Sequence, residues 1–414
     1  MSLATLTACI AGIVQLPLLA VWLVLSGYLV FLTASAGLGR VRRRAPVPAA
    51  APTTRFSILV PAHDEALVLG PCLTSLTSFD YPAALRRVIV IADNCTDATA
   101  SIARASGVTV YERHDAERRG KGYALNWAMP RLLGGDAGWT DAVVIFDADT
   151  LADAAFLRHL DSRLRRGSLA LQGRYDLLNP FHNWRTALLY CALLLFNRVR
   201  TLARDTWGWT NLLKGNGMCF ARAVVDRFGW NAYSLAEDIE FTTTLLHAGI
   251  RVDAVGEAIL YAQAPQTAGQ ADSPRMRWEG GRVALARRDG LRLLRDALRE
   301  RSPAKLDWAL DLLMPPLAIL VGVPGILLLG NVLLMLLAGA PAHVGVAWAL
   351  ALFGIGCYVV AGLGIGGADP RAYLYLLATP LLLVWKLRIY ALMLLGRGAR
   401  GWVRTERTRI RPAD

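Results

Sequence analysis

The stretch Ala142-Val-Val-Ile-Phe-Asp-Ala-Asp149 decides the fold, because an apolar run ends there in two carboxylates separated by one alanine. A short apolar run of this kind predicts a buried strand. Ligands of parallel α/β sheets bind beyond the carboxyl ends of the strands, so Asp147 and Asp149 are expected at a ligand-binding edge. Carboxylates in such a place suit a hard divalent cation, Mg²⁺ or Mn²⁺, that also binds a diphosphate.

Strand-like and helix-like segments alternate before this stretch. Strands are predicted at 56–60, 87–92 and 108–111, and helices at 66–76, 97–106 and 122–133. Strands that alternate with helices predict an α/β domain with a doubly wound, mostly parallel sheet. The polar segment that contains them is long enough to form one such domain with its own core.

Composition and hydropathy indicate a membrane protein. The chain has 414 residues, of which 54% are hydrophobic, and a formal net charge of +13. Residues 1–39 contain no charged side chain, and residues 10–32 are long enough to cross a bilayer as one helix. A cleaved signal peptide is the alternative, but the basic start and small-residue cleavage site of such peptides are missing. We therefore expect this segment to remain as a membrane helix.

A second apolar region follows the polar segment, and no charged residue occurs between 312 and 368. Prolines and glycines divide the region into candidate spans at 310–338, 344–366 and 372–395. The positive-inside rule places the arginine clusters at 40–44 and 397–411 on the cytoplasmic side, which requires an even number of carboxy-terminal crossings. The sequence leaves open whether 310–338 makes two short passes or one apolar segment lies in the interface, so two to four crossings are possible.

The predicted organisation is an integral, multi-pass protein of the inner (cell) membrane with a cytoplasmic catalytic domain. Its segments are an amino-terminal transmembrane helix (1–39), a basic, proline-containing linker (40–52), the polar domain (53–282), an amphipathic interface helix (283–307), carboxy-terminal transmembrane helices (308–396) and a basic cytoplasmic tail (397–414). Arginines alternate with leucines in the interface helix, which favours contact with anionic membrane lipids. A solvated face of the polar domain is the alternative.

Two motifs of the polar domain precede Asp147. Asp93 ends the second predicted strand, where its carboxylate could accept a hydrogen bond from a nucleobase imino group; a turn-stabilising aspartate is the alternative. Lys121 lies in Arg119-Gly-Lys-Gly122 directly before a helix, which suits an anionic ligand. A solvated surface turn is the default reading of that motif alone.

Two motifs after Asp149 suit sugar or phosphate. Gly215 and Asn216 belong to a glycine-bearing loop that would let backbone approach a sugar closely, with a tight turn as the alternative. Arg277 and Trp278 offer a guanidinium for a diphosphate and an aromatic face for a sugar ring.

The polar domain resembles the inverting family-2 glycosyltransferases through an ordered set of motifs: Val60-Pro-Ala-His-Asp-Glu65, Ala92-Asp-Asn-Cys-Thr-Asp97, Gly120-Lys-Gly-Tyr-Ala-Leu-Asn126, Asp147-Ala-Asp149, Glu237-Asp238 and Arg275-Met-Arg-Trp278. Within that family it is most similar to the membrane-embedded synthases related to cellulose, chitin, hyaluronan and poly-N-acetylglucosamine synthases. The resemblance spans residues 56–282 and implies a GT-A-like nucleotide-sugar domain.

The resemblance implies a role for each matching residue. The expected donor is a nucleotide-sugar, a UDP-sugar in particular, because Asp93 matches the acid that binds uracil. The implied donor-binding residues are Asp93, Lys121, Asp147 and Arg277, the metal ligands Asp149 and Asp147, and the acceptor-binding residues Trp278, Glu237, Gly215 and Asn216. Asp238 is implied as the base that deprotonates the acceptor hydroxyl. Stabilisation of a helix amino terminus is the alternative role for Glu237 and Asp238.

The acceptor is the least determined part of the prediction. Pro274 stands where the polymerising relatives carry glutamine in a Gln-X-X-Arg-Trp pattern, which puts the acceptor contact in doubt. A growing polysaccharide is the expected acceptor, and a membrane lipid that receives a single sugar is the alternative. A non-catalytic transporter or scaffold is a remote alternative, because 312–368 offers no charged substrate pathway. The acidic motifs and membrane spans exclude a nucleic-acid partner.

Overall fold

The computed structural model describes residues 3–42, 51–135 and 138–394. The chain divides into two compact units, which we call the sheet unit and the helical unit. Of the described residues, the sheet unit comprises mainly 51–135, 138–190 and 208–292. The helical unit comprises 3–42, 191–207 and 293–391. Every candidate site residue named above belongs to the sheet unit.

The sheet unit is built on one eight-stranded sheet with the strand order β3-β2-β1-β4-β7-β6-β8-β5. The strands are β1 (Phe56–Ala62), β2 (Arg86–Asp93), β3 (Thr109–Arg113), β4 (Ala142–Ile145), β5 (Thr150–Ala152), β6 (Ala170–Leu177), β7 (Met218–Ala221) and β8 (Val252–Ala262). The first four strands are parallel, as are β6 and β8, whereas β7 runs antiparallel to both its neighbours. The predicted α/β fold with a mostly parallel sheet is confirmed.

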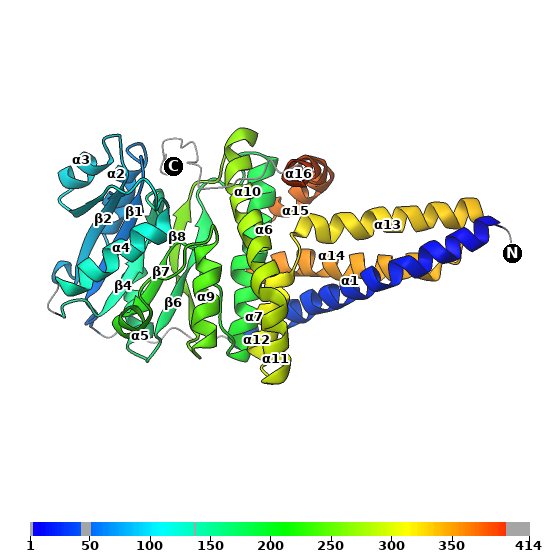
Figure 1. Cartoon of the computed structure of the whole chain (residues 1–414), viewed down its shortest axis with the longest axis horizontal. Helices are drawn as coiled ribbons and strands as arrows, with labels where there is room; N and C mark the ends of the chain where they lie inside the picture. The colour runs from blue at the N-terminus through cyan, green and yellow to red at the C-terminus, as the bar shows by residue number, and fades with distance from the viewer. Residues whose placement is uncertain (1–2, 43–50, 136–137, 395–414) are drawn as a thin grey trace. The chain divides into compact units, whose positions relative to one another are not determined.

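Helices flank the sheet, and all those before β8 lie in connections between its strands (Figure 1). They are α2 (Leu69–Thr77), η1 (Ala83–Leu85), α3 (Thr99–Ala105), α4 (Lys121–Gly134), α5 (Phe156–Leu164), α6 (Trp184–Leu194), α8 (Arg222–Phe228), α9 (Glu237–His247), α10 (Ala268–Leu285) and η3 (Ala286–Gly290). The helices predicted at 66–76, 97–106 and 122–133 correspond to α2, α3 and α4. The last turn of α6 belongs to the helical unit.

Alternate residues of the central strands build two separate cores, because successive side chains of a strand point to opposite faces. Val144 and Phe146 join one core with α2 and α5. Val143 and Ile145 join the other with α4, α8 and α9. A sheet buried on both faces explains why the deciding stretch is continuously apolar rather than alternating.

The helical unit contains the long apolar helices. Its elements are α1 (Leu3–Arg42), η2 (Leu195–Val199), α7 (Arg200–Trp207), α11 (Leu291–Arg299), α12 (Pro303–Leu313), α13 (Leu317–Ala338), α14 (His343–Gly366), α15 (Arg371–Tyr375), η4 (Leu376–Ala378) and α16 (Thr379–Leu394). Helices α1, α13 and α14 run side by side (Figure 1). Polar side chains join them: Gln15 accepts hydrogen bonds from Asn331 and Trp348, and Ser26 donates to the Ala351 carbonyl. Such bonds between apolar helices contribute to their association in a bilayer.

Five helices in the described part of the chain are long and apolar enough to cross a membrane. They cover Ile13–Val41, Trp184–Trp207, Leu317–Ala338, His343–Gly366 and Arg371–Tyr390. The predicted span at 344–366 matches α14 closely. The predicted span at 310–338 is broken at Met314–Pro316, so that α12 and α13 are separate helices.

The predicted polar domain of 53–282 is not one continuous unit. Cys191–Trp207 belongs to the helical unit, since Leu194, Leu195 and Val199 pack onto α14 at Gly362 and Gly366, where no side chain is in the way. Arginines within 198–204 lower the mean hydropathy of this segment, so the sequence pattern did not reveal it.

Two of those arginines, Arg200 and Arg204, take part in a buried ionic network of the helical unit. Arg204 pairs with Asp307 at 2.8 Å and with Asp311 at 3.3 Å, and Arg200 pairs with Asp311. Tyr28 donates to Asp307 at 2.7 Å, which ties α1 to the same cluster. Two arginines and two aspartates balance in charge, which is how charged groups are tolerated away from water.

Candidate active site

The turn after β4 presents Asp147 and Asp149 as predicted. Asn216 holds this turn from both ends, because its Oδ1 accepts from the Asp147 N–H at 3.1 Å and its Nδ2 donates to Thr150 Oγ1 at 2.7 Å. Asn216 is 1% exposed, and both polar atoms of its side-chain amide bond to this turn. In this structure Asn216 positions the acidic turn, and its expected contact with an acceptor stays a prediction.

Lys121 joins that turn to the Lys214–Gly217 loop. Its Nζ donates to Asp147 Oδ1 at 2.5 Å and to the Gly215 carbonyl. Burial lowers the pKa of Lys121, but the nearby carboxylates Asp147, Glu237 and Asp238 outweigh it and raise the pKa above its usual value. Lys121 is consequently a permanent cation, suited to the phosphates of a donor, at the centre of an acidic cluster.

Gly215 lies between the lysine and the predicted base. It has a φ of +72°, and a side chain there would begin 3.6 Å from Asp238 Oδ2 and 3.9 Å from Lys121 Nζ. A residue without a side chain at this point leaves open the space beside the carboxylate. Gly215 therefore lies beside the predicted base, and its contact with an acceptor stays a prediction.

Glu237 and Asp238 form the first turn of α9. The Ile239 N–H donates to Asp238 Oδ1 at 2.8 Å, which orients the carboxylate. Burial, followed by the negative charge of Glu237, raises the pKa of Asp238 to about 7. A carboxylate with a pKa in this range is matched to accepting a proton near neutral pH.

Arg277 and Trp278 lie on α10. The positive charge of Arg277 acts on Glu237, which places the guanidinium near the acidic cluster. The Trp278 side chain is 49% exposed and available to a ligand. Helix α10 approaches the segment before Asp238 closely, because a side chain at Gly281 would begin 3.1 to 3.2 Å from Ala236.

The acidic turn fits a divalent cation. Asp147 and Asp149 are both partly exposed, and Asn216 fixes the backbone that carries them. Mg²⁺ is commonly bound through one or two carboxylates plus substrate phosphates rather than by a complete protein cage. The two aspartates would supply those carboxylates, and Lys121 and Arg277 carry the positive charge that would suit the phosphates.

Asp93 ends β2 and is nearly buried. Its Oδ1 pairs with Arg113 Nη1 at 2.5 Å and accepts from Asn94 Nδ2 at 3.0 Å. His63 Nδ1 lies 2.6 Å from the Asp93 carbonyl oxygen, which links this strand end to that of β1. Burial raises the pKa of Asp93, while Arg113, His63 and Asn94 oppose the rise.

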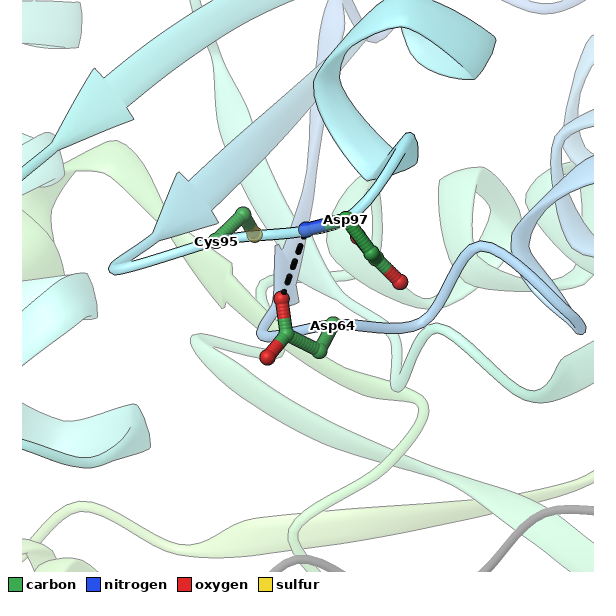
Figure 2. A group of neighbouring side chains, drawn as sticks. All are labelled: Asp64, Cys95 and Asp97. Atoms are coloured by element: carbon green, nitrogen blue, oxygen red, sulfur yellow. Dashed lines mark hydrogen bonds between the residues drawn. The ribbon is translucent and has the colours of Figure 1, made fainter.

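A second acidic group nearby has a structural role. Asp64, Cys95 and Asp97 lie close enough to share an ion, and Figure 2 shows the Asp97 N–H donating to the Asp64 carboxylate. Asp64 also accepts from the Thr96 N–H and hydroxyl, and Asp97 accepts from the Thr99 N–H at the start of α3. These carboxylates accept hydrogen bonds from backbone N–H groups and so hold together the loops after β1 and β2. The contacts of Asp97 fit a residue that stabilises the start of α3.

Two residues that shape the site were not predicted from the sequence. A side chain on Gly122 would overlap the Ala232 carbonyl oxygen, so this glycine lets α4 pack against the segment leading to Asp238. Arg113 holds Asp93, as described above. The position of Arg113 at the end of a predicted strand could have indicated this contact, since neighbouring parallel strands end at the same edge of a sheet.

Comparison with known proteins identifies the family of this chain. The sequence model of "Glycosyltransferase like family 2" matches residues 52–281, more than half of the 414-residue chain. Beta-monoglucosyldiacylglycerol synthase of Nostoc is 30% identical over 200 residues, covering 46% of this chain and 40% of that protein. Poly-beta-1,6-N-acetyl-D-glucosamine synthase of Staphylococcus aureus is 25% identical over 248 residues and 56% of each chain. The chain thus spans about half the length of these curated relatives.

A solved structure shares the fold. The mannosyltransferase PcManGT of Pyrobaculum calidifontis, determined with GDP-Man and Mn²⁺, superposes with a TM-score of 0.51 at 21% sequence identity, covering 84% of this chain and 98% of that one. This similarity confirms the predicted GT-A-like architecture, and the sequence match confirms the predicted resemblance. The chain belongs to glycosyltransferase family 2.

Proposed function

We propose that the protein transfers a sugar from a nucleotide-sugar, specifically a UDP-sugar, to an acceptor hydroxyl with inversion of the anomeric centre. One observation carries the proposal: Lys121, Asp147, Gly215, Glu237 and Asp238 come from four separate segments and meet in one partly buried cluster. A basic and an acidic group beside a metal-compatible turn are what a single displacement on a diphosphate-linked sugar requires.

In this mechanism Asp238 accepts the proton of the acceptor hydroxyl as its oxygen attacks the anomeric carbon. The bond from that carbon to the diphosphate oxygen breaks in the same step, and the nucleoside diphosphate leaves from the opposite face. Asp238 is oriented for this by the Ile239 N–H, and its raised pKa lets it hold the proton until it passes to solvent.

Lys121 and Arg277 stabilise the negative charge that develops on the departing diphosphate. A divalent cation bound by Asp149 and Asp147 would add charge neutralisation on the same phosphates. Asn216 keeps these two carboxylates in place. Asp93 would bind the base of the donor.

A growing polysaccharide is our first candidate for the acceptor. The exposed indole of Trp278 and the neighbouring Arg277 provide an apolar face and a cation where an acceptor sugar would lie. A lipid that receives a single sugar is the second candidate. The Nostoc relative, whose name denotes a glucosyldiacylglycerol synthase, favours it, as does Pro274.

We further propose that the protein is a multi-pass inner-membrane protein with a cytoplasmic catalytic site. The five apolar helices support this placement. The arginine-rich segment from α10 through α11 exposes Leu291 and Leu298, which fits contact with membrane lipids.

The first test is release of UDP by the purified full chain from a panel of UDP-sugars with Mg²⁺ or Mn²⁺. Asp238→Asn should lower turnover by about 10²-fold or more, the usual contribution of a positioned base. Asp226→Asn is the matched control, because Asp226 lies on α8 in an exposed pair with Arg222. Full activity of Asp238→Asn would refute the assigned base.

The second test is product sizing with radiolabelled donor and membrane-lipid extract. A ladder of lengths would support the polysaccharide acceptor. A single lipid-soluble product would support the lipid acceptor. No turnover with any nucleotide-sugar would refute the proposed function.

A further inference from the structure

Arg113 is a buried cation that joins two parts of the donor side of the site. It ends β3, and its side chain is 4% exposed. Nη1 binds Asp93 Oδ1 at 2.5 Å. Nη2 donates to Asp115 Oδ2 at 2.8 Å and to the Arg118 carbonyl at 2.7 Å, in the loop that leads to Lys121.

The two oxygens of Asp93 are used differently. Oδ1 accepts from both Arg113 and Asn94. Oδ2 accepts no hydrogen bond from any residue in the described ranges. Because Arg113 and Asn94 both hold Oδ1, the carboxylate has one fixed orientation, with Oδ2 available as an acceptor.

We propose that Arg113 sets the base specificity of the donor site by holding Asp93 in the orientation and charge state that accept an N–H from the nucleobase. The inference rests on the proposed function, in which Asp93 binds that base. Arg113 itself does not contact the reacting atoms, so it is a positioning residue.

The chemistry of the bases makes this arrangement selective. Uracil presents an N–H at ring position 3, whereas cytosine presents a lone pair there, which an ionised carboxylate repels. A buried site built to accept an N–H rejects an analogue that lacks it, because the acceptor is left unpaired. Burial alone raises the pKa of Asp93, so without the Arg113 charge the carboxyl would be protonated more often and could donate to cytosine.

The other terminal nitrogen of Arg113, Nη2, orders the loop that leads to Lys121, the residue expected to bind the phosphates. Asp115 accepts from the Glu117 and Arg118 N–H groups, and the Asp115 N–H donates to Asn94 Oδ1. The turn before Lys121 is thereby fixed to the same guanidinium that holds Asp93. Arg113 consequently positions both Asp93, which would bind the base, and the turn before Lys121, which would bind the phosphates.

The test is binding of UDP and of CDP to the purified full chain with Mg²⁺, measured by calorimetry and without turnover. A hydrogen bond to a charged group is worth about 1.5–3 kcal/mol, so wild type should bind UDP at least about tenfold more tightly than CDP. Arg113→Met should weaken UDP binding by about tenfold or more and reduce the UDP-to-CDP preference to about threefold or less. Arg113→Lys should retain part of the UDP-to-CDP preference that Arg113→Met loses.

Two further variants make the result specific. Asp93→Asn removes the charge without removing Arg113 and should lose the same preference. Arg55 lies directly before β1 and pairs with Asp141, which lies directly before β4, at the end of these strands opposite to Asp93. Arg55→Met removes this ion pair and should keep the UDP-to-CDP preference of wild type.

An unchanged UDP-to-CDP ratio in folded Arg113→Met or in Asp93→Asn would overturn the inference while leaving the proposed transfer intact. Equal weakening of both nucleotides would also overturn it, since that is the effect of general destabilisation. Wild type that binds neither nucleotide and turns over no donor would refute the proposed function itself.

Discussion

Replacing Glu237 with glutamine should move the pH dependence of sugar transfer to lower pH. The reason is electrostatic: burial comes first, but the charge of Glu237 is the next cause that raises the pKa of Asp238 to about 7. Glutamine keeps the size of the side chain and removes that charge. The pKa of Asp238 should therefore fall in the variant, and its ionised form should persist in more acidic solution.

The expected size follows from the ionised fraction of the base. With a pKa of about 7, the fraction of Asp238 that can accept a proton is roughly 9% at pH 6 and roughly 91% at pH 8. The wild-type rate at subsaturating donor should therefore rise about tenfold over this interval. In Glu237→Gln the same rise should shrink toward about twofold, because about half of the base is then already ionised at pH 6.

The assay is initial-rate UDP release across pH 5.5–8.5 at fixed ionic strength and metal concentration, with Glu257→Gln as the matched control. Glu257 lies on β8 and pairs at 3.8 Å with Arg163, so it should leave the profile unchanged. A wild-type profile that is flat or falls with rising pH would refute the assignment of Asp238 as base. A Glu237→Gln profile displaced to higher pH would refute the electrostatic reasoning.

Three other predictions test the packing, the metal and the helical unit. Gly122→Ala should lower turnover by about 10²-fold, because the added methyl group overlaps the Ala232 carbonyl and displaces the segment before the base, whereas Gly134→Ala at the open end of α4 should be neutral or slightly stabilising. Chelation with EDTA should abolish UDP release, and Mg²⁺ or Mn²⁺ should restore it; full activity in EDTA would contradict the metal assignment. Arg204→Met should destabilise the detergent-solubilised protein by about 3–5 kcal/mol, since Asp307 loses its buried partner, and adding Asp307→Asn should recover part of that loss in a denaturation experiment.

Much of the fold follows from local patterns. The apolar runs at β1, β2 and β4 are flanked by polar strand ends, and their spacing with α2, α3 and α4 predicted the parallel half of the sheet. The antiparallel strand β7 and the pairing of β6 with β8 were not predicted. They join segments far apart in the chain, and strand pairing over such distances has no periodic signature in the sequence.

The candidate site, like the fold, was predicted from the sequence only in part. Asp147, Asp149, Lys121 and Asp238 could be identified from motifs because each lies at the end of a strand or the start of a helix. Asn216 was predicted to bind the acceptor from its glycine-bearing loop, whereas the structure shows its amide bonded to the turn after β4. The hydrogen-bond partners of a side chain depend on which distant segments pack together, and local sequence patterns do not encode that packing.

The sequence by itself determined that carboxylates end a buried strand, that a lysine precedes a helix, and that apolar helices flank the polar segment. These are properties of neighbouring residues, and local propensity and hydropathy encode them. Only the tertiary structure decided that Arg113 holds Asp93, that Lys121 reaches Asp147 and Gly215, and that Cys191–Trp207 belongs to the helical unit. Burial and charge pairing between distant segments set these relations, because an isolated buried charge must find its partner wherever the fold brings one within reach.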